Sequence, residues 1–184
     1  MEINNLDLHS SQLDTILLPS LLGRVFHVTR LNVFEQILAA EEIRANTNGE
    51  FSSIFGSTNS YFRKRSCVSF FDYRSASRKQ IDDAIGKCSP YNLPAANPEL
   101  INEPDIVFLF LASAAHNRLI PWTKWEEEKA YGDKIIPWVE AGYPDSVPIT
   151  LIEEVLRVKI DHPTDSIAAV LRRARFQRGA KTIG

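Results

Sequence analysis

The chain lacks the sequence patterns of several common catalytic and binding sites. Neither GxxxxGK[ST] nor GxGxxG occurs, so the sequence offers no P-loop and no Rossmann fingerprint. The pattern G-x-S-x-G of serine hydrolases is also absent. No two of the four histidines are four residues apart, and Cys67 and Cys88 do not have the spacing of a metal or redox pair. We therefore expect no metal site.

The chain also has little that points to a membrane or to export. Its longest apolar run, residues 106 to 112, is far shorter than the roughly 20 residues that a spanning helix needs. The N-terminus has neither a basic nor an apolar region, so we expect no signal peptide. The net charge of −2 gives no global attraction to nucleic acid or to a membrane surface. Together with two isolated thiols, these features predict a cytoplasmic protein without a membrane partner.

What is present predicts one folded domain. Hydrophobic residues make up 44% of the 184 residues, which is enough for a sizeable core. We expect an N-terminal helix within residues 1–23, a core over 24–160, and a basic C-terminal helix and tail over 161–184. Periodicity predicts strands at 24–29, 67–71, 106–112, 135–139 and 154–160, and helices at 31–42, 78–87 and 165–176. Because the helices gather mainly in the N-terminal half, the fold class is expected to be α+β.

His27 is the first candidate functional residue. In the strand, it shares one face with Val25 and Thr29, while Phe26 and Val28 point to the other face. This polar position in a buried strand fits a ligand contact. The alternative is a histidine that is simply satisfied within the core.

Glu140 is the second candidate, because Trp138 and Tyr143 place aromatic surface beside its carboxylate. The alternative is a strand-edge charge that faces water. The neighbouring acids Glu126, Glu127 and Glu128 are more typical of a solvated helix face.

Two basic segments are candidates for phosphate contacts. Arg63, Lys64 and Arg65 follow Tyr61 and Phe62, and interleaved aromatic and basic residues suit a phosphate-bearing or base-bearing ligand. The last thirteen residues carry five positive charges and no acid, including Arg172, Arg173 and Arg175. That tail fits a nucleic-acid backbone, an antitoxin-facing helix, or a soluble tail.

Several of these segments resemble one family in order and spacing. His27-Val28-Thr29, the helix ending at Glu42-Ile43, and Val68-Ser69-Phe70-Phe71 resemble the front half of ADP-ribosyltransferase-like domains. Glu140 and the segment from Val147 to Val155 resemble the back half. The pattern is most similar to the DarT-like ADP-ribosyltransferase toxins of bacteria, over about residues 24 to 160.

The resemblance implies a split, bent sheet and a set of roles in NAD binding. It implies that His27 bonds the nicotinamide ribose, that the Val28 backbone holds the carboxamide, and that Thr29 supports the pocket. Glu140 would be the catalytic glutamate. The aromatic that stacks on nicotinamide would be Tyr61, Phe70 or Phe71, and the pyrophosphate would meet Arg63 or Arg65. NAD would be the substrate, and no metal would be needed.

The resemblance also implies an NAD-dependent toxin or phage-defence effector. The protein-modifying members carry a Gln or Glu two residues before the catalytic glutamate, where this chain has Trp138. We therefore favour DNA or RNA as the acceptor, bound in part through Arg172, Arg173 and Arg175. The alternatives are a protein-modifying transferase, an NAD glycohydrolase, and a non-catalytic relative that binds nucleotides or proteins.

Overall fold

A computed structural model describes residues 1–50, 58–90 and 105–161 of the chain. The strands are β1 (Glu2–His9), β2 (Val25–Arg30), β3 (Glu42–Ile43), β4 (Cys67–Asp72), β5 (Asp105–Leu111), β6 (Ile120–Pro121), β7 (Glu140–Pro144), β8 (Val147–Pro148) and β9 (Ile152–Asp161). The helices are α1 (Leu18–Leu21), α2 (Leu31–Ala40), α3 (Arg78–Lys87) and α4 (Thr123–Glu127), with shorter helical turns between them. Of these helices, α1, α2 and α3 lie in the N-terminal half of the chain.

Seven strands form one mixed sheet in the order β1-β9-β5-β2-β4-β7-β6, and β3 pairs with β8 separately. Among the described strands, β1 and β9 are the one parallel pair, and every other pair in the sheet is antiparallel. This arrangement confirms the expected α+β class and differs from a doubly wound parallel sheet.

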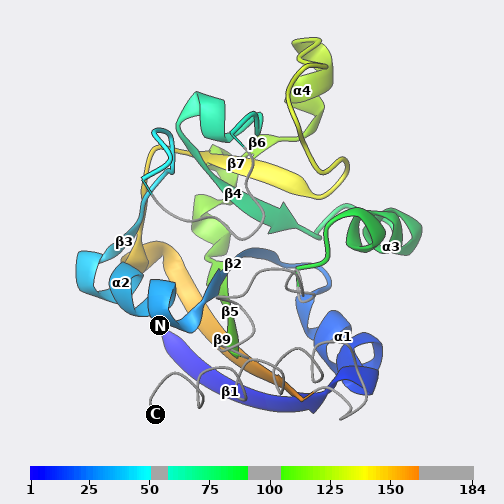
Figure 1. Cartoon of the computed structure of the whole chain (residues 1–184), viewed down its shortest axis with the longest axis vertical. Helices are drawn as coiled ribbons and strands as arrows, with labels where there is room; N and C mark the ends of the chain where they lie inside the picture. Colours follow the sequence, from blue (N-terminus) through cyan, green and yellow to red (C-terminus); the bar gives the residue numbers. More distant parts are fainter. Residues whose placement is uncertain (51–57, 91–104, 162–184) are drawn as a thin grey trace, which may run out of the picture.

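The sheet divides between β2 and β4. These two strands pair only at Val25↔Asp72 and Phe26↔Phe71. Beyond Phe26, β2 continues along β5 as far as Arg30, while β4 pairs with β7 from Cys67 to Phe71. In Figure 1, β4, β7 and β6 lie in the upper half of the molecule, and β2, β5, β9 and β1 in the lower half. Past Phe26, the facing edges of β2 and β4 are therefore not paired with any strand of the described residues.

Two apolar cores cover the two faces of the sheet. Alternating residues of β2 and β5 face opposite sides, as the pleat requires, so that Phe26 lies in one core and Val25 in the other. The first core packs against α1 and α3, and the second against α2. β5 is buried from Ile106 to Leu111, as expected for a strand with neighbours on both edges and cores on both faces.

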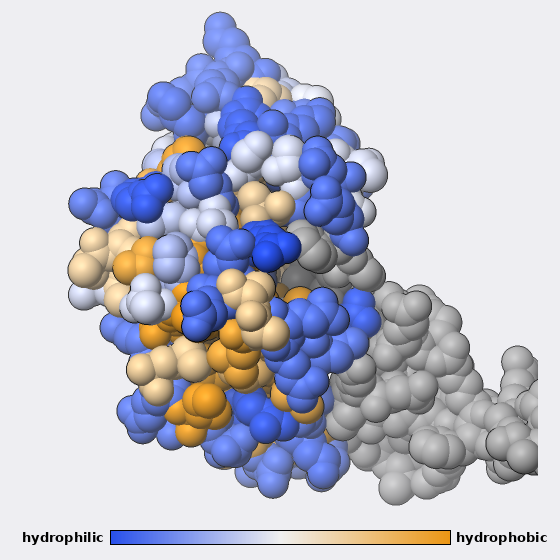
Figure 2. Space-filling view, turned by 90° about the vertical axis from the view of Figure 1, so that its left-hand side faces the viewer, coloured by the Kyte–Doolittle hydropathy of each residue, from blue (hydrophilic) through white to orange (hydrophobic). Residues whose placement is uncertain are grey.

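Apolar and hydrophilic residues gather on different parts of the surface. Figure 2 shows the face that carries α2, with apolar residues gathered over its lower half and hydrophilic residues over its upper half. Exposed large apolar side chains of the described residues include Ile3 in β1 and Leu38 in α2. Within the described residues, no helix is long and apolar enough to cross a membrane.

The expected N-terminal helical segment is partly wrong. Residues 2–9 form β1, because Leu6 and Leu8 alternate toward the first core and the strand pairs along most of β9. Helical turns follow only from Ser10 to Leu21, and the His9 side chain caps them rather than a serine. The basic helix expected at 165–176 lies outside the described residues.

The strand expected at 135–139 is also wrong, since β7 begins only at Glu140. Pro137 has no backbone N–H to donate, and Trp138 takes a left-handed conformation with φ 69°. The N–H of Glu140 instead bonds back to the carbonyl of Ile136 at 3.1 Å. The segment is therefore a turn that delivers Glu140 to the start of β7.

Candidate functional site

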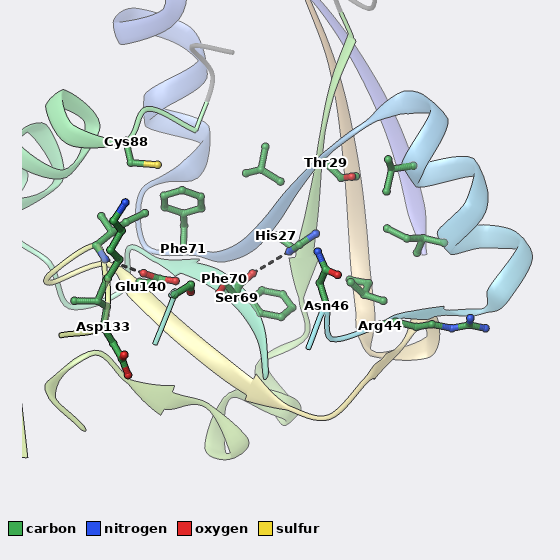
Figure 3. A pocket seen from close by; sticks show the side chains of 18 of the residues that line it. His27, Thr29, Arg44, Asn46, Ser69, Phe70, Phe71, Cys88, Asp133 and Glu140 are labelled. Atoms are coloured by element: carbon green, nitrogen blue, oxygen red, sulfur yellow. Dashed lines mark hydrogen bonds between the residues drawn. The ribbon is translucent and has the colours of Figure 1, made fainter. Parts of the chain in front are cut away.

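A pocket of about 720 Å³ lies where the sheet divides. Its walls come from β2, α2, β3, β4, the end of α3 and the segment that leads into β7. Figure 3 shows side chains from these elements around a common space. The volume falls within the range of roughly 300–1,000 Å³ that small-molecule and cofactor sites occupy.

His27 lines this pocket from β2. Its Nδ1 atom lies 2.9 Å from the backbone carbonyl oxygen of Ser69 in β4, so the bond joins the two halves of the sheet. The dashed line in Figure 3 marks this contact. Burial lowers the pKa of His27, and the bond to Ser69 partly opposes this effect. His27 is therefore held neutral and in one orientation.

Glu140 lines the same pocket from the first position of β7. Its side chain is almost fully buried, and its Oε2 accepts a 2.7 Å hydrogen bond from the backbone N–H of Ile136. Burial raises the pKa of Glu140, while the bonds from Ile136 and from the Ser69 hydroxyl act in the opposite direction. Because the Glu140 side chain is almost fully buried, few water molecules can surround the charge of its carboxylate.

Ser69 contacts both candidate residues, and sequence reasoning missed it. Its carbonyl accepts from His27, and its side chain bonds to Glu140. Ser69 lies opposite Gly142, and Phe71 lies opposite Glu140, so Ser69 and Glu140 are diagonal neighbours on one face. The signal available in the sequence was the position of this serine, in the middle of an otherwise apolar run from 67 to 71.

The aromatic residues that line the pocket include Phe70 and Phe71 of β4 and Trp125 of α4. Val28 and Thr29 of β2 also line it, and Thr29 is buried.

Tyr61, the third candidate for stacking on nicotinamide, does not line the pocket. Its ring is fully buried against Phe62, beneath the guanidinium of Arg65. The expectation for Tyr61 is therefore corrected, because its ring is part of a separate small core.

Arg63 and Arg65 do not line the pocket, contrary to their expected role with pyrophosphate. Arg65 is held in ion pairs with Glu128 and Asp133, and the Arg63 guanidinium packs against Gly49. Lys64 lies between these two arginines in the sequence, and its ammonium group also pairs with Asp133, at 2.5 Å. This cluster fastens the segment before β7 to the turn before β4.

Other cations line the pocket instead, namely Arg44 after β3, Lys87 at the end of α3, and Lys134 before β7. Arg44 bonds to the Glu42 carboxylate at 2.9 Å. The three cations come from separate segments of the chain, so they form no basic cluster in the sequence that would have predicted them as pocket residues.

The remaining candidates lie away from the pocket or outside the described residues. Glu126 and Glu127 are exposed on α4, as expected for a solvated face. Arg172, Arg173 and Arg175 lie outside the described residues.

The pocket therefore combines a buried carboxylate, a neutral histidine and two phenylalanines, with cations from three further segments. Such a set can hold a planar aromatic group, bond to hydroxyls, and stabilise positive charge that develops beside Glu140. Comparisons with protein-family models, with curated proteins and with solved structures find no match to this chain.

Proposed function

We propose that this protein is an NAD-dependent ADP-ribosyltransferase. The observation that carries the proposal is the placement of His27 and Glu140 in one pocket at the division of the sheet, with Ser69 bonded to both. The two residues come from distant parts of the sequence, and each is the position that the resemblance selects. The resemblance to DarT-like toxins assigns both to the nicotinamide ribose.

The chemistry follows from charge. When the bond between C1′ of the ribose and the nicotinamide nitrogen breaks, its electron pair leaves with neutral nicotinamide, and positive charge develops on the ribose. A carboxylate bonded to the 2′-hydroxyl stabilises that oxocarbenium-like state, as in glycoside hydrolysis. Glu140 is suited to this task because the Ile136 N–H and the Ser69 hydroxyl fix it in place before the reaction.

Further residues of the pocket supply binding to the nicotinamide end of NAD. Phe70 and Phe71 offer apolar faces for nicotinamide, and His27 offers a ring nitrogen to a ribose hydroxyl.

The diphosphate needs cations, and we assign it to Arg44 and Lys134 in place of Arg63 and Arg65, because only the first two line the pocket. Asn46 lines the same wall as Arg44 and adds a neutral hydrogen-bonding group.

We further propose that the acceptor is nucleic acid. A lone pair on the acceptor forms the new bond to C1′, and the acceptor proton passes to solvent. The absence of an acid two residues before Glu140 supports this choice, because Trp138 occupies that position. By resemblance, the biological role would be that of a bacterial toxin or phage-defence effector.

The test is incubation of the purified protein with cell lysate and NAD labelled in its adenine part. We expect label that nuclease releases and protease does not. Label released by protease would make the protein a protein-modifying transferase, and free ADP-ribose would make it an NAD glycohydrolase. No nicotinamide release under any condition would contradict an enzyme and favour a binding protein. The Glu140→Gln variant is the matched control.

A further inference from the structure

Two tryptophans form an aromatic pair beside the proposed reaction site. The rings of Trp122 and Trp138 meet edge to face, with centroids 6.4 Å apart. Both side chains are only partly buried, and among the described residues neither indole N–H has a hydrogen-bond partner. Trp125, by contrast, donates its indole N–H to the Asp133 carbonyl at 3.0 Å. Within residues 1–50, 58–90 and 105–161, the pair therefore keeps two donors available for a bound molecule.

A cation completes this surface. The Nζ atom of Lys87, at the last position of α3, lies 4.9 Å from the Trp138 ring centroid. Lys87 is exposed and takes part in no ion pair between described residues, whereas Lys79 at the start of the same helix pairs with Asp83 at 2.8 Å. We call Trp122, Trp138 and Lys87 the tryptophan platform.

The platform lies next to Glu140 in the chain and in space. Trp138 precedes Glu140 by two residues, and Ile136 and Pro137 of the same turn line the pocket, as does Lys87. The left-handed backbone at Trp138 and the bond from Ile136 to Glu140 belong to one compact turn. A molecule on the platform would therefore lie beside the pocket.

We propose that the tryptophan platform binds a base and a neighbouring phosphate of a single-stranded nucleic acid, the acceptor under the function proposed above, on which this inference rests. Any base can stack on an accessible aromatic face, and a nearby cation suits the phosphate. The indole N–H groups can donate to phosphate oxygen or to a base edge. The platform thereby holds one nucleotide beside the ribosyl cation.

The test measures binding of a fluorescent oligothymidylate of about 12 nucleotides, a length within known single-strand site sizes. Replacing an aromatic side chain that stacks on a base by alanine costs about 1–3 kcal/mol of binding free energy. Trp122→Ala should therefore raise the Kd at least about fivefold. Trp122→Phe keeps an aromatic face and should raise it less. Lys87→Ala should reduce the slope of log K against log salt by about 0.7, and the control Lys79→Ala should not. Thermal unfolding of each variant verifies that it is folded.

Equal Kd values for wild type, Trp122→Ala and Trp122→Phe would overturn the platform. Equal effects of Lys87→Ala and Lys79→Ala on the slope of log K against log salt would also overturn it, as would a complete lack of binding at low salt. Binding requires neither NAD nor turnover, so its outcome is separate from that of the proposed enzyme. A wild-type protein that releases no nicotinamide, yet binds the oligonucleotide through Trp122, would contradict the transferase and support the platform. If the protein releases nicotinamide but its Kd for the oligonucleotide does not change in the Trp122 variants, only the platform is contradicted.

Discussion

The Nδ1 atom of His27 lies 2.9 Å from the carbonyl oxygen of Ser69, across the line where the sheet divides. A carbonyl oxygen can only accept, so Nδ1 carries the proton. Because burial also lowers the pKa of His27, the ring is neutral near pH 7, and its Nε2 atom is an acceptor. The second nitrogen of the ring points away from Ser69 in Figure 3. His27 can therefore accept a hydrogen bond from a ribose hydroxyl while it holds the two sheet halves together.

Replacing His27 by alanine should weaken NAD binding more than it slows the chemical step. Loss of one hydrogen bond to the ligand corresponds to about a tenfold rise in KM. The measurement is nicotinamide release at a series of NAD concentrations. His116→Ala is the matched control, because His116 also bonds to a backbone carbonyl, at 3.0 Å, but does not line the pocket. Equal effects of the two substitutions would remove His27 from the site.

The Glu140→Gln variant should lose nicotinamide release by about 100-fold or more while it still binds NAD. The amide retains the size and the acceptor oxygen for the Ile136 N–H, but it lacks the charge that stabilises the ribosyl cation. Binding by calorimetry and release by chromatography separate the two effects. Glu126→Gln, on the exposed face of α4, should behave as wild type. Activity near wild type in Glu140→Gln would assign the catalytic role to another group.

The same variant should be more stable than wild type at neutral pH. Burial raises the pKa of Glu140 above its ordinary value of 4.5, so the folded protein binds this proton more tightly than the unfolded chain does. The stability that the proton contributes is complete below pH 4.5 and is lost as the pH rises through the raised pKa. Glutamine does not ionise. The gain in Tm should therefore be largest at neutral pH and shrink as the pH falls toward the ordinary pKa, with about 2–4 °C for each kcal/mol. A gain that is independent of pH would contradict this account.

Ser69→Ala should impair Glu140 while it leaves the bond from His27 to the backbone carbonyl intact. The bond from the Ser69 hydroxyl favours the charged form of Glu140, so its removal should raise the pKa of Glu140 further. The acidic limb of the pH profile of nicotinamide release should move to higher pH, and kcat should fall by about tenfold. Ser69→Thr keeps a hydroxyl and should recover part of the activity. A uniform decrease with an unchanged pH profile would indicate a purely structural role.

Lys134→Ala should raise the KM for NAD, whereas Arg65→Ala should mainly lower stability. Lys134 lines the pocket, whereas Arg65 does not, although one of its two ion-pair partners, Asp133, is a lining residue and the other, Glu128, is not. Removing one charged hydrogen bond to a phosphate oxygen corresponds to about a tenfold change in KM. Thermal unfolding and NAD kinetics on both variants make the comparison. The reverse pattern would restore the assignment of the diphosphate to Arg65.

Local sequence patterns determined the elements that carry the site. Helix α3 has the bounds that its periodicity predicts, β2 is shifted by one residue from its expected range, and β4 extends one residue further than expected. The alternation of Val25 and Phe26 correctly assigned the faces of β2. These features follow from backbone period and side-chain polarity, which are properties of a few consecutive residues.

Tertiary structure decided which of the candidate residues share the pocket. Tyr61 and Arg65 are residue types that suit a ligand site, yet neither lines the pocket. The Tyr61 ring packs beneath the Arg65 guanidinium, and that guanidinium pairs with Glu128 and Asp133. Ser69 meets both candidate residues only because β4 pairs with β7 in one register and separates from β2 after two residue pairs. Pairing and register depend on the free energy of the whole sheet and its two cores. The sequence alone thus determined the faces of β2 and selected His27 and Glu140, which both line the pocket, and the division of the sheet determined which side chains meet them.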